Sequence, residues 1–335
     1  MSIEPNTPLI DRFGRVHTSL RISVTDRCNI RCFYCMPLEN ARFKPRDELL
    51  TFEEMTRVVR VAAGHGISKL RLTGGEPLVR SNLSQLIQML KAVPGIQEIA
   101  LTTNGILLPD QAADLKSAGL DRLNISLDAL SEELFERITR RQGVQKVLDG
   151  IAAAKSVGFE NVRLNAVAIQ NLTECEIVPL ANFARENDLH LRFIEFMPLD
   201  ADRAWDKSQV LSGRQLREMI AQEVAPLHDL DREDKSQPAV DYEYADGRQR
   251  VGFINSVTEP FCGTCNRLRI TAEGQLRNCL FGSEEWDARQ VLRTGGTDAD
   301  LSARLHSCVQ AKKPSHGMDS PEFVPPERAM YQIGG

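Results

Sequence analysis

One pattern recurs through the first 230 residues: a short β-branched run is followed by a segment with helical spacing of apolar residues. In residues 52–64 the apolar positions recur every three to four residues, and Thr51 before them is a typical helix N-cap. Repeated strand–helix units predict a parallel sheet with right-handed crossovers. Six units are fewer than the eight of a closed barrel. We therefore predict an α/β fold with a partial (βα)6, TIM-like barrel. The strands are expected at residues 20–24, 70–73, 98–102, 122–127, 162–169 and 189–196, and the helices at 52–64, 83–90, 109–118, 143–156, 174–186 and 214–223.

The pattern changes after residue 230. Residues 227–238 are polar and charged, which indicates a linker or exposed loop. Two short strands are expected beyond it, at 240–244 and 248–255, joined by the hairpin signal Asp246-Gly247. A helix over 298–313 is expected to end before Pro314. We therefore divide the chain into a core, residues 1–230, and a C-terminal α+β region, residues 231–335.

Composition and charge exclude several classes of protein. The net charge of −5 argues against broad nucleic-acid binding, which needs a basic surface. No apolar run approaches the roughly 20 residues that span a membrane, and the first residues lack the pattern of a secretory leader. We therefore expect a cytoplasmic protein with no nucleic-acid or membrane partner. In a reducing cytoplasm, clustered cysteines indicate metal or redox chemistry more often than disulfides.

The first cysteine cluster is Cys28, Cys32 and Cys35, with the spacing C-x3-C-x2-C. Three thiolates this close in sequence can bind three irons of a [4Fe–4S] cube, which leaves the fourth iron free to bind a small molecule. A structural zinc ion would need a fourth ligand, and no histidine lies nearby in sequence. The alternative is a zinc or redox centre completed by a distant residue.

The second cluster is Cys262, Cys265 and Cys279, with the spacing C-x2-C-x13-C. A C-x2-C pair followed by another cysteine is a strong metal signal. We interpret these three as ligands of a second [4Fe–4S] cluster with one open iron. A zinc ribbon completed by Cys308 is the alternative. Cys175 has no motif role.

The first cluster, with the aromatic Tyr34 just before its last cysteine, resembles the signature of the radical S-adenosylmethionine (SAM) enzymes. That family has a (βα)6 core and uses SAM bound to the open iron as the source of a 5′-deoxyadenosyl radical. The resemblance extends to Thr73-Gly-Gly-Glu-Pro77, and it implies that Gly74, Gly75 and Glu76 hold the SAM ammonium group. It also implies that Tyr34 belongs to the cofactor site, that Ser126 contacts SAM and that Met197 packs near the adenine, although Met197 is equally compatible with a core residue.

The two triplets together narrow the resemblance to the GTP 3′,8-cyclase family. The matching motifs cover nearly the whole chain, at residues 20–28, 71–77, 192–197, 265–269 and 333–335. The resemblance implies two [4Fe–4S] clusters, SAM, and conversion of GTP to (8S)-3′,8-cyclo-7,8-dihydroguanosine 5′-triphosphate, the first step of molybdenum cofactor biosynthesis. Two alternatives stay open: a radical SAM enzyme with an auxiliary cluster that acts on another substrate such as a peptide, and a metal-binding regulator without catalysis.

No G-x4-G-K-[ST] loop occurs in the chain, so a triphosphate would have to be bound by guanidinium groups, whose fork matches phosphate oxygens. The resemblance implies substrate contacts from Arg21, Arg71, Thr102, Arg163, Arg192, Arg267, Leu268 and Arg269. Arg163 departs from the family, which usually has lysine there, so its contact geometry is altered. The tail Gly334-Gly335 would ordinarily be a frayed terminus, but the resemblance implies that it enters the active site and is needed for activity.

The resemblance also implies partners. These are GTP as substrate, an electron donor such as flavodoxin or ferredoxin, and cyclic pyranopterin monophosphate synthase as the next enzyme. A homodimer is a further expectation.

Overall fold

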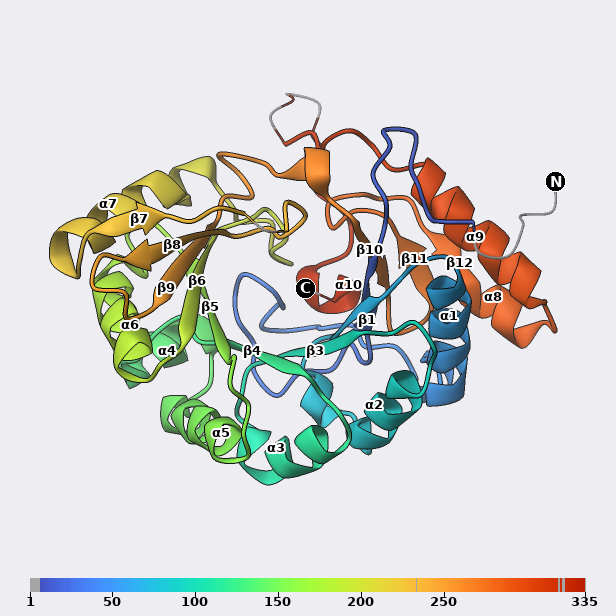
Figure 1. The fold of residues 1–335 in the computed structure, drawn as a ribbon, viewed down its shortest axis with the longest axis horizontal. Coiled ribbons are helices and arrows are strands. Elements are labelled where there is room, and N and C mark those ends of the chain that lie inside the picture. The colour runs from blue at the N-terminus through green and yellow to red at the C-terminus, as the bar shows by residue number, and fades with distance from the viewer. Residues whose placement is uncertain (1–6, 233, 319, 321–322, 335) are drawn as a thin grey trace.

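The computed structural model of the protein describes residues 7–232, 234–318, 320 and 323–334. Its central feature is one 12-stranded sheet in the order β12-β11-β10-β1-β2-β3-β4-β5-β6-β9-β8-β7. Six consecutive strands of this sheet pair in parallel and form the curved wall of an open barrel (Figure 1). These are β1 (Ser19–Ser23), β2 (Lys69–Thr73), β3 (Glu98–Thr103), β4 (Arg122–Ser126), β5 (Arg163–Ala168) and β6 (His190–Glu195). The predicted partial (βα)6 barrel is confirmed.

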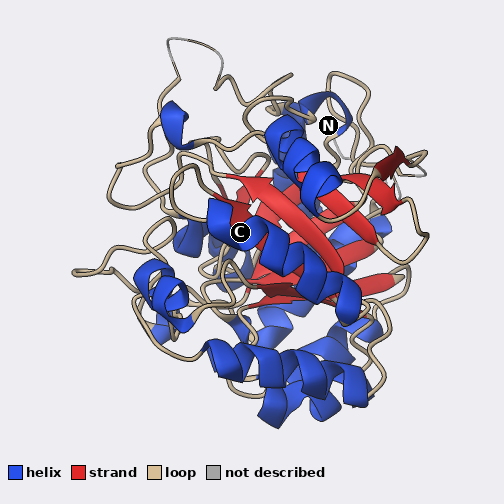
Figure 2. Cartoon of the chain, turned by 90° about the vertical axis from the view of Figure 1, so that its left-hand side faces the viewer, coloured by secondary structure: helices blue, strands red, loops and turns tan. Residues whose placement is uncertain are grey.

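Helices cover the outer face of this wall (Figures 1 and 2). Helix α1 illustrates why they form where they do: Thr51 makes a capping box with Glu54, and the buried face consists of the predicted apolar residues. The outer helices are α1 (Phe52–Gly64), α2 (Leu83–Lys91), α3 (Leu108–Ser117), α4 (Glu132–Thr139), α5 (Val144–Ser156), α6 (Glu174–Glu186) and α7 (Gly213–Glu223). All but α4 were predicted, each to within a residue or two of its observed ends.

The strands that follow α7 extend both edges of the barrel sheet. On one side β9 (Arg250–Ile254) pairs in parallel with β6, and β8 (Val240–Tyr244) and β7 (Leu227–Asp229) follow antiparallel. On the other side β10 (Arg267–Ile270) pairs in parallel with β1, and β11 (Gln275–Arg277) and β12 (Trp286–Asp287) follow antiparallel. Helices α8 (Ala288–Arg293) and α9 (Asp298–Gln310) pack beside β11 and β12. The β8–β9 hairpin was predicted; β7, β10–β12 and α8 were not, and α9 ends three residues earlier than expected.

The chain then returns to the middle of the barrel. The short helix α10 (Met330–Ile333) lies in the barrel opening (Figure 1). The Met330 amide donates to the carbonyl of Leu199 at 3.3 Å, and the Tyr331 ring packs edge-on against Phe43 with centroids 6.0 Å apart. The part of the chain that the structure describes contains no helix long and apolar enough to cross a membrane.

Candidate active site

A cavity of about 310 Å³ lies inside the barrel, at the carboxyl ends of the parallel strands. Parallel α/β folds bind their ligands at this end. The cavity is lined by the core strands and by the C-terminal region, and all six motif cysteines contribute to its wall: Cys28, Cys32, Cys35, Cys262, Cys265 and Cys279. All six are free thiols. Two motifs more than 200 residues apart in the sequence therefore meet at one chamber.

The first triplet forms a tight turn after β1. The amides of Cys35 and Met36 both donate to the carbonyl of Cys32, at 3.0 and 2.9 Å. Burial raises the pKa of the Cys28 thiol to about 11, and burial also raises the pKa of Cys32 and Cys35. Because a metal binds the thiolate, these thiols need a nearby positive metal centre to ionise. Three buried thiols that influence one another's pKa therefore fit the iron ligands of the predicted first cluster.

The second triplet lies on a turn before β10 and just after β11. Although burial alone would raise it, the pKa of Cys265 is lowered to about 5 by Arg267 and Lys312. An Nη atom of Arg267 lies 3.4 Å from the Cys265 sulfur. Cys308, the suggested fourth zinc ligand, lies elsewhere: it is buried in the hydrophobic core and does not line the cavity. The second triplet therefore stands as a three-thiol site.

Neither triplet is a single-ion site. Among the described residues, no three His, Cys, Asp or Glu side chains converge closely enough to share one metal ion. A cubane cluster has different needs, because each thiolate binds a separate iron. Within each triplet the thiols lie near enough to interact electrostatically, as three ligands of one cluster would.

The Gly74-Gly75-Glu76 turn at the end of β2 packs directly onto the chain that follows β1. A Cβ on Gly75 would lie 2.4 Å from the Arg27 carbonyl oxygen, and one on Gly74 would lie 2.3 Å from that of Thr25, so only glycine fits. The Glu76 carboxylate accepts hydrogen bonds from Leu78 N, Thr103 Oγ1 and Asn104 N, at 3.0, 2.7 and 2.7 Å. Burial raises the pKa of Glu76 to about 7. Glu76 thus joins the ends of β2 and β3 at the cavity wall, and its contact with a SAM ammonium group stays a prediction.

Tyr34, Ser126 and Met197 line the same cavity, as their predicted cofactor roles require. The Tyr34 hydroxyl donates to Asp128 at 2.5 Å, and Asp128 also accepts from the amide of Val167 at 2.8 Å. Burial raises the pKa of Asp128 to about 6. Asp128 therefore fixes the tyrosine next to the first triplet, a role that our sequence reasoning missed. The one feature of the sequence that could have indicated Asp128 is its position at the end of the strand expected at residues 122–127.

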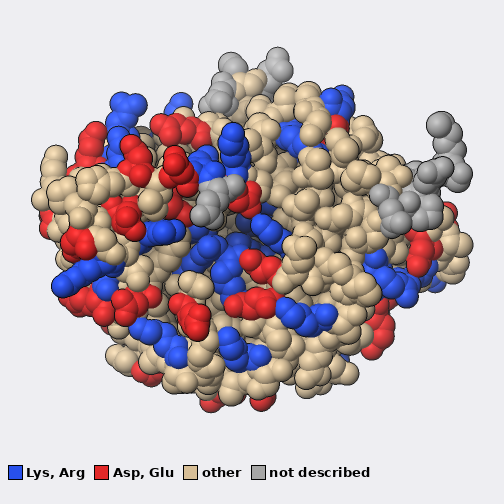
Figure 3. Space-filling model, viewed as in Figure 1, with Lys and Arg blue, Asp and Glu red and all other residues tan. Residues whose placement is uncertain are grey.

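The arginines form a row across the sheet. Arg21 on β1 lies in register with Arg71 on β2 and with Arg269 on β10. Burial and the neighbouring guanidinium groups lower the pKa of all three. In the described part of the chain Arg21 and Arg71 have no carboxylate partner, whereas Arg192 pairs with Asp241 at 3.1 Å. Figure 3 shows basic side chains gathered in the central hollow. Positive charges that repel one another and lack an anion indicate a site for a polyanion.

Two further predicted substrate residues do not line the cavity. Arg163, at the start of β5, lines a separate polar pocket beside β6, β8 and β9. Leu268 is buried in the hydrophobic core, because it alternates along β10 with the cavity-facing Arg267 and Arg269. Thr102 does line the cavity, and within the described part of the chain its buried Oγ1 has no hydrogen-bond partner. A buried hydroxyl left unpaired indicates a missing ligand group.

Gly334 comes back to the ends of β1 and β2. Its φ of +83° suits glycine, and a Cβ would lie 2.9 Å from the Cβ of Ser23. Its carbonyl oxygen accepts a hydrogen bond from Arg269, a member of the arginine row. The predicted entry of the tail into the site therefore agrees with the position of Gly334; Gly335 lies outside the described residues.

Comparison with known proteins decides the family. Residues 22–184 match the sequence model of the Radical SAM superfamily, and residues 189–318 match the model named Molybdenum Cofactor Synthesis C. The GTP 3′,8-cyclase of Rhodopirellula baltica is 52% identical over 98% of this chain and 92% of its own length. The chain belongs to the GTP 3′,8-cyclase family. Other GTP 3′,8-cyclases are also similar, among them that of Streptomyces coelicolor, at 42% identity over 98% of this chain and 96% of the relative.

Some solved structures have a similar fold to this cyclase-family chain, although their sequence identity to it is low. The structure of Streptococcus suis SuiB bound to the precursor peptide SuiA has a TM-score of 0.62 and 16% identity, covering 92% of this chain and 68% of that one. A structure of anSMEcpe with bound AdoMet has a TM-score of 0.61 and 15% identity, covering 91% and 79%. These likenesses concern the fold alone.

Proposed function

We propose that this chain converts GTP to (8S)-3′,8-cyclo-7,8-dihydroguanosine 5′-triphosphate, the first step of molybdenum cofactor biosynthesis. The observation that carries the proposal is that a single cavity is lined by both thiol triplets and by a row of arginines that have no carboxylate partner among the described residues. One triplet suits the cluster that binds SAM, the second suits a cluster near substrate, and the arginines suit a triphosphate.

The residues have separate tasks. Cys28, Cys32 and Cys35 would hold one [4Fe–4S] cluster, and Cys262, Cys265 and Cys279 the other. When bound, the clusters and SAM supply an adenosyl radical that abstracts hydrogen from the ribose C3′ of GTP, and the electrons that the reaction needs.

The chain itself contributes binding and orientation. Arg21, Arg71 and Arg269 line the cavity as a continuous basic row and would fix the triphosphate. The hydroxyl of Thr102, which has no hydrogen-bond partner among the described residues, would donate a hydrogen bond to the nucleotide or accept one from it. α10 and Gly334 lie in the barrel opening, where they would narrow the path of water to the site. Gly74, Gly75, Glu76, Tyr34, Ser126 and Met197 would surround SAM, and Arg192 and Arg267 would add to the phosphate site.

Other expectations belong to the same proposal. They are a core of residues 1–230 and a C-terminal region of residues 231–335, a cytoplasmic location, a flavodoxin or ferredoxin as electron donor, hand-off of the product to cyclic pyranopterin monophosphate synthase, and a homodimer. Direct substrate contacts from Arg163 and Leu268 are expected only if the bound state differs from the present arrangement around β5 and β10.

The test is anaerobic reconstitution with iron and sulfide, followed by incubation with SAM, a reductant and GTP. We expect 5′-deoxyadenosine and a cyclised nucleotide of the mass of GTP. Cys28→Ala should abolish SAM cleavage, and Cys279→Ala should abolish nucleotide formation. Cys175→Ala is the matched control, because Cys175 is exposed and lies outside both triplets, and it should behave as the unaltered chain. SAM cleavage with a peptide but no cyclised nucleotide from GTP would support the alternative substrate and refute the proposal.

A further inference from the structure

A buried lysine lies beside the second thiol triplet, and the proposed reaction gives it no role. Lys312 follows α9, and its residue is only 3% exposed. Its ammonium group donates to the carbonyl of Arg267 at 3.0 Å and to that of Asn278 at 2.5 Å. Arg267 comes two residues after Cys265, and Asn278 immediately precedes Cys279. One ammonium group therefore connects the two chain segments that carry these two cysteines.

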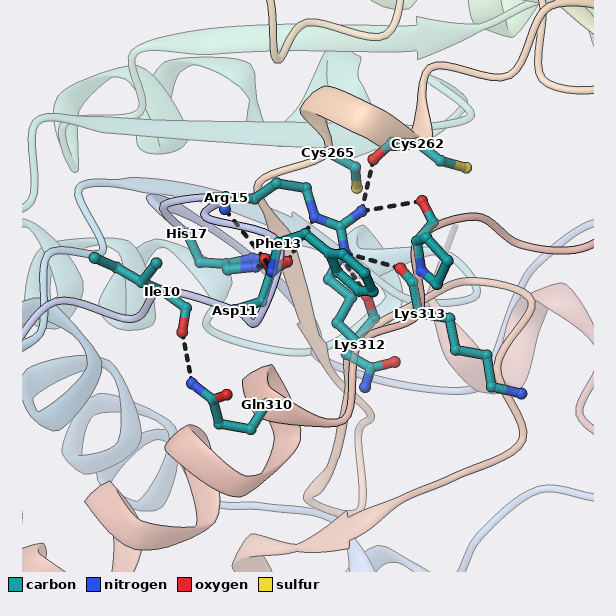
Figure 4. Close-up of polar contacts among 12 residues, drawn as sticks. Ile10, Asp11, Phe13, Arg15, His17, Cys262, Cys265, Gln310, Lys312 and Lys313 are labelled. Carbon is teal, nitrogen blue, oxygen red and sulfur yellow. Dashed lines mark hydrogen bonds and ion pairs between the residues drawn. The ribbon is translucent and has the colours of Figure 1, made fainter.

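The third cysteine of the triplet is held by another cation (Figure 4). Arg15 donates from Nη1 to the carbonyl of Cys262 at 2.7 Å. From the same guanidinium it donates to the carbonyls of Lys313 and Pro314, at 2.8 and 3.3 Å. Arg15 thus ties the Cys262 turn to the segment that presents Lys312. Each cysteine-bearing segment of the triplet is fastened by a basic side chain from outside it.

The two cations differ in charge balance. The Nε of Arg15 lies 2.6 Å from the carboxylate of Asp11, so Arg15 is neutralised within its own segment. His17 also contacts Asp11, and burial together with Lys312 lowers the pKa of His17 to about 4, so that the ring is neutral near pH 7. Among the residues that the structure describes, no carboxylate lies within ion-pair distance of Lys312. Lys312 is the member of this network whose charge remains uncompensated.

A buried ammonium group without a counter-ion costs several kcal/mol. Carbonyl oxygens solvate it but bring no charge. The groups beside it that can carry negative charge are the thiols of the triplet, because the two carbonyls that Lys312 contacts lie on the segments of Cys265 and Cys279 and a metal binds cysteine as the thiolate. A [4Fe–4S] core bound by three thiolates carries net negative charge, and this charge increases on reduction.

We propose that Lys312 is a positioning residue of the second cluster: its ammonium group ties the Cys265 and Cys279 segments together, and its charge balances the cluster and raises its reduction potential. The inference rests on the second cluster of the proposed function. The charge of Arg15 is balanced by Asp11. Arg15 therefore positions the third ligand, Cys262, but does not affect the reduction potential of the cluster.

The experiment is a redox titration of the reconstituted full chain, monitored by electron paramagnetic resonance, with iron and sulfide analysis of the same samples. SAM is added to mark the signal of the first cluster. In Lys312→Met we expect the ratio of reduced to oxidised second cluster, at a fixed potential, to fall about tenfold, which is about 59 mV for a one-electron couple. The first cluster should titrate as before. Lys312→Arg keeps the charge and should keep the potential. Lys313→Met is the matched control, because this neighbouring lysine has an exposed side chain and should change nothing.

The outcomes separate cleanly. A selective negative shift of the second cluster, or its selective loss with the first retained, supports the proposal. Equal potentials in Lys312→Met and the unaltered chain overturn it. Loss of both clusters alike, or of the fold, also overturns it, because Lys312 would then serve the protein in general and not this cluster. Failure of the proposed function is seen independently, as absence of a second cluster or of cyclised nucleotide in the unaltered chain.

Discussion

Replacing Arg71 by methionine should make the empty protein more stable and its nucleotide binding weaker. Arg71 lies in the arginine row, in register with Arg21 one strand away, and its pKa is lowered by burial and then by Arg21, Arg122, Arg192 and Arg267. Two unit charges about 8 Å apart repel by about 2 kcal/mol when the effective dielectric constant is about 20. Because the cavity is open to solvent, we discount this and expect Arg71→Met to raise the free energy of unfolding by about 1 kcal/mol.

The same change removes charge-assisted hydrogen bonds to the triphosphate, each worth about 1.5–3 kcal/mol. The Kd for GTP should therefore rise by about 10- to 100-fold. Urea unfolding of the thiol-reduced, cluster-free chain measures the first effect, and anaerobic titration calorimetry of the reconstituted chain measures the second. Arg137→Met is the control, because Arg137 is exposed on α4 and should change neither quantity measurably. A variant that is less stable than the unaltered chain and binds GTP equally well would refute the reasoning.

Three further changes test individual contacts. Gly75→Ala places a Cβ 2.4 Å from the Arg27 carbonyl oxygen and should lower the free energy of unfolding by about 3 kcal/mol. Gly64→Ala is the control, because a Cβ at this last residue of α1 would meet nothing within 4 Å, and it should leave the free energy of unfolding unchanged or slightly higher. Urea unfolding compares the two variants, and equal effects would contradict the close packing of the Gly75 turn. Thr102→Val removes a buried hydroxyl that no described residue pairs with, so it should raise the melting temperature of the empty chain while weakening GTP binding. A lower melting temperature would show that the hydroxyl already has a hydrogen-bond partner. Burial raises the pKa of Glu76 from 4.5 to about 7, so as the pH rises this carboxyl ionises in the unfolded chain before it does in the folded one. The free energy of unfolding should therefore fall between these two pH values. Glu76→Gln should flatten this part of the stability–pH curve, and an unchanged slope would exclude Glu76 as its source.

The sequence predicts well those features that local patterns determine. The six core strands and their flanking helices follow from buried β-branched runs, helical spacing and caps such as Thr51, and they appear within a residue or two of their expected ends. Helix α4 was missed although Ser131 caps it, because its eight residues are too short for a clear period. Strands β10–β12 have two to four residues each, and β10 forms through pairing with β1, almost 250 positions earlier. No local pattern carries that information.

The candidate site divides in the same way. Both thiol triplets could be found from their spacing, but that they share a cavity depends on the long-range pairing of β10 with β1. Asp128, Lys312 and Arg15 have no motif around them. Their roles follow from what they contact after folding, such as the Tyr34 hydroxyl or the Cys262 carbonyl. Charged residues that hold the site residues in place, and belong to no motif themselves, are therefore the part of the site that is hardest to predict from a single sequence.

The register between β1 and β10 connects fold and chemistry most directly. Arg21 pairs with Arg269, and Leu20 with Leu268, so that arginines face the cavity on both strands while the leucines face the core. Because side chains alternate along a strand, a slip of one residue would exchange these faces on β10. Arg267 and Arg269 would enter the apolar core, Leu268 would enter the cavity, and Cys265 would move by about 3.3 Å relative to the first triplet. Burial of Leu268 and Ile270 makes that slip unfavourable. The apolar side of β10 thus sets the distance between the two thiol triplets, and the hydrophobic core determines a geometry that the chemistry requires.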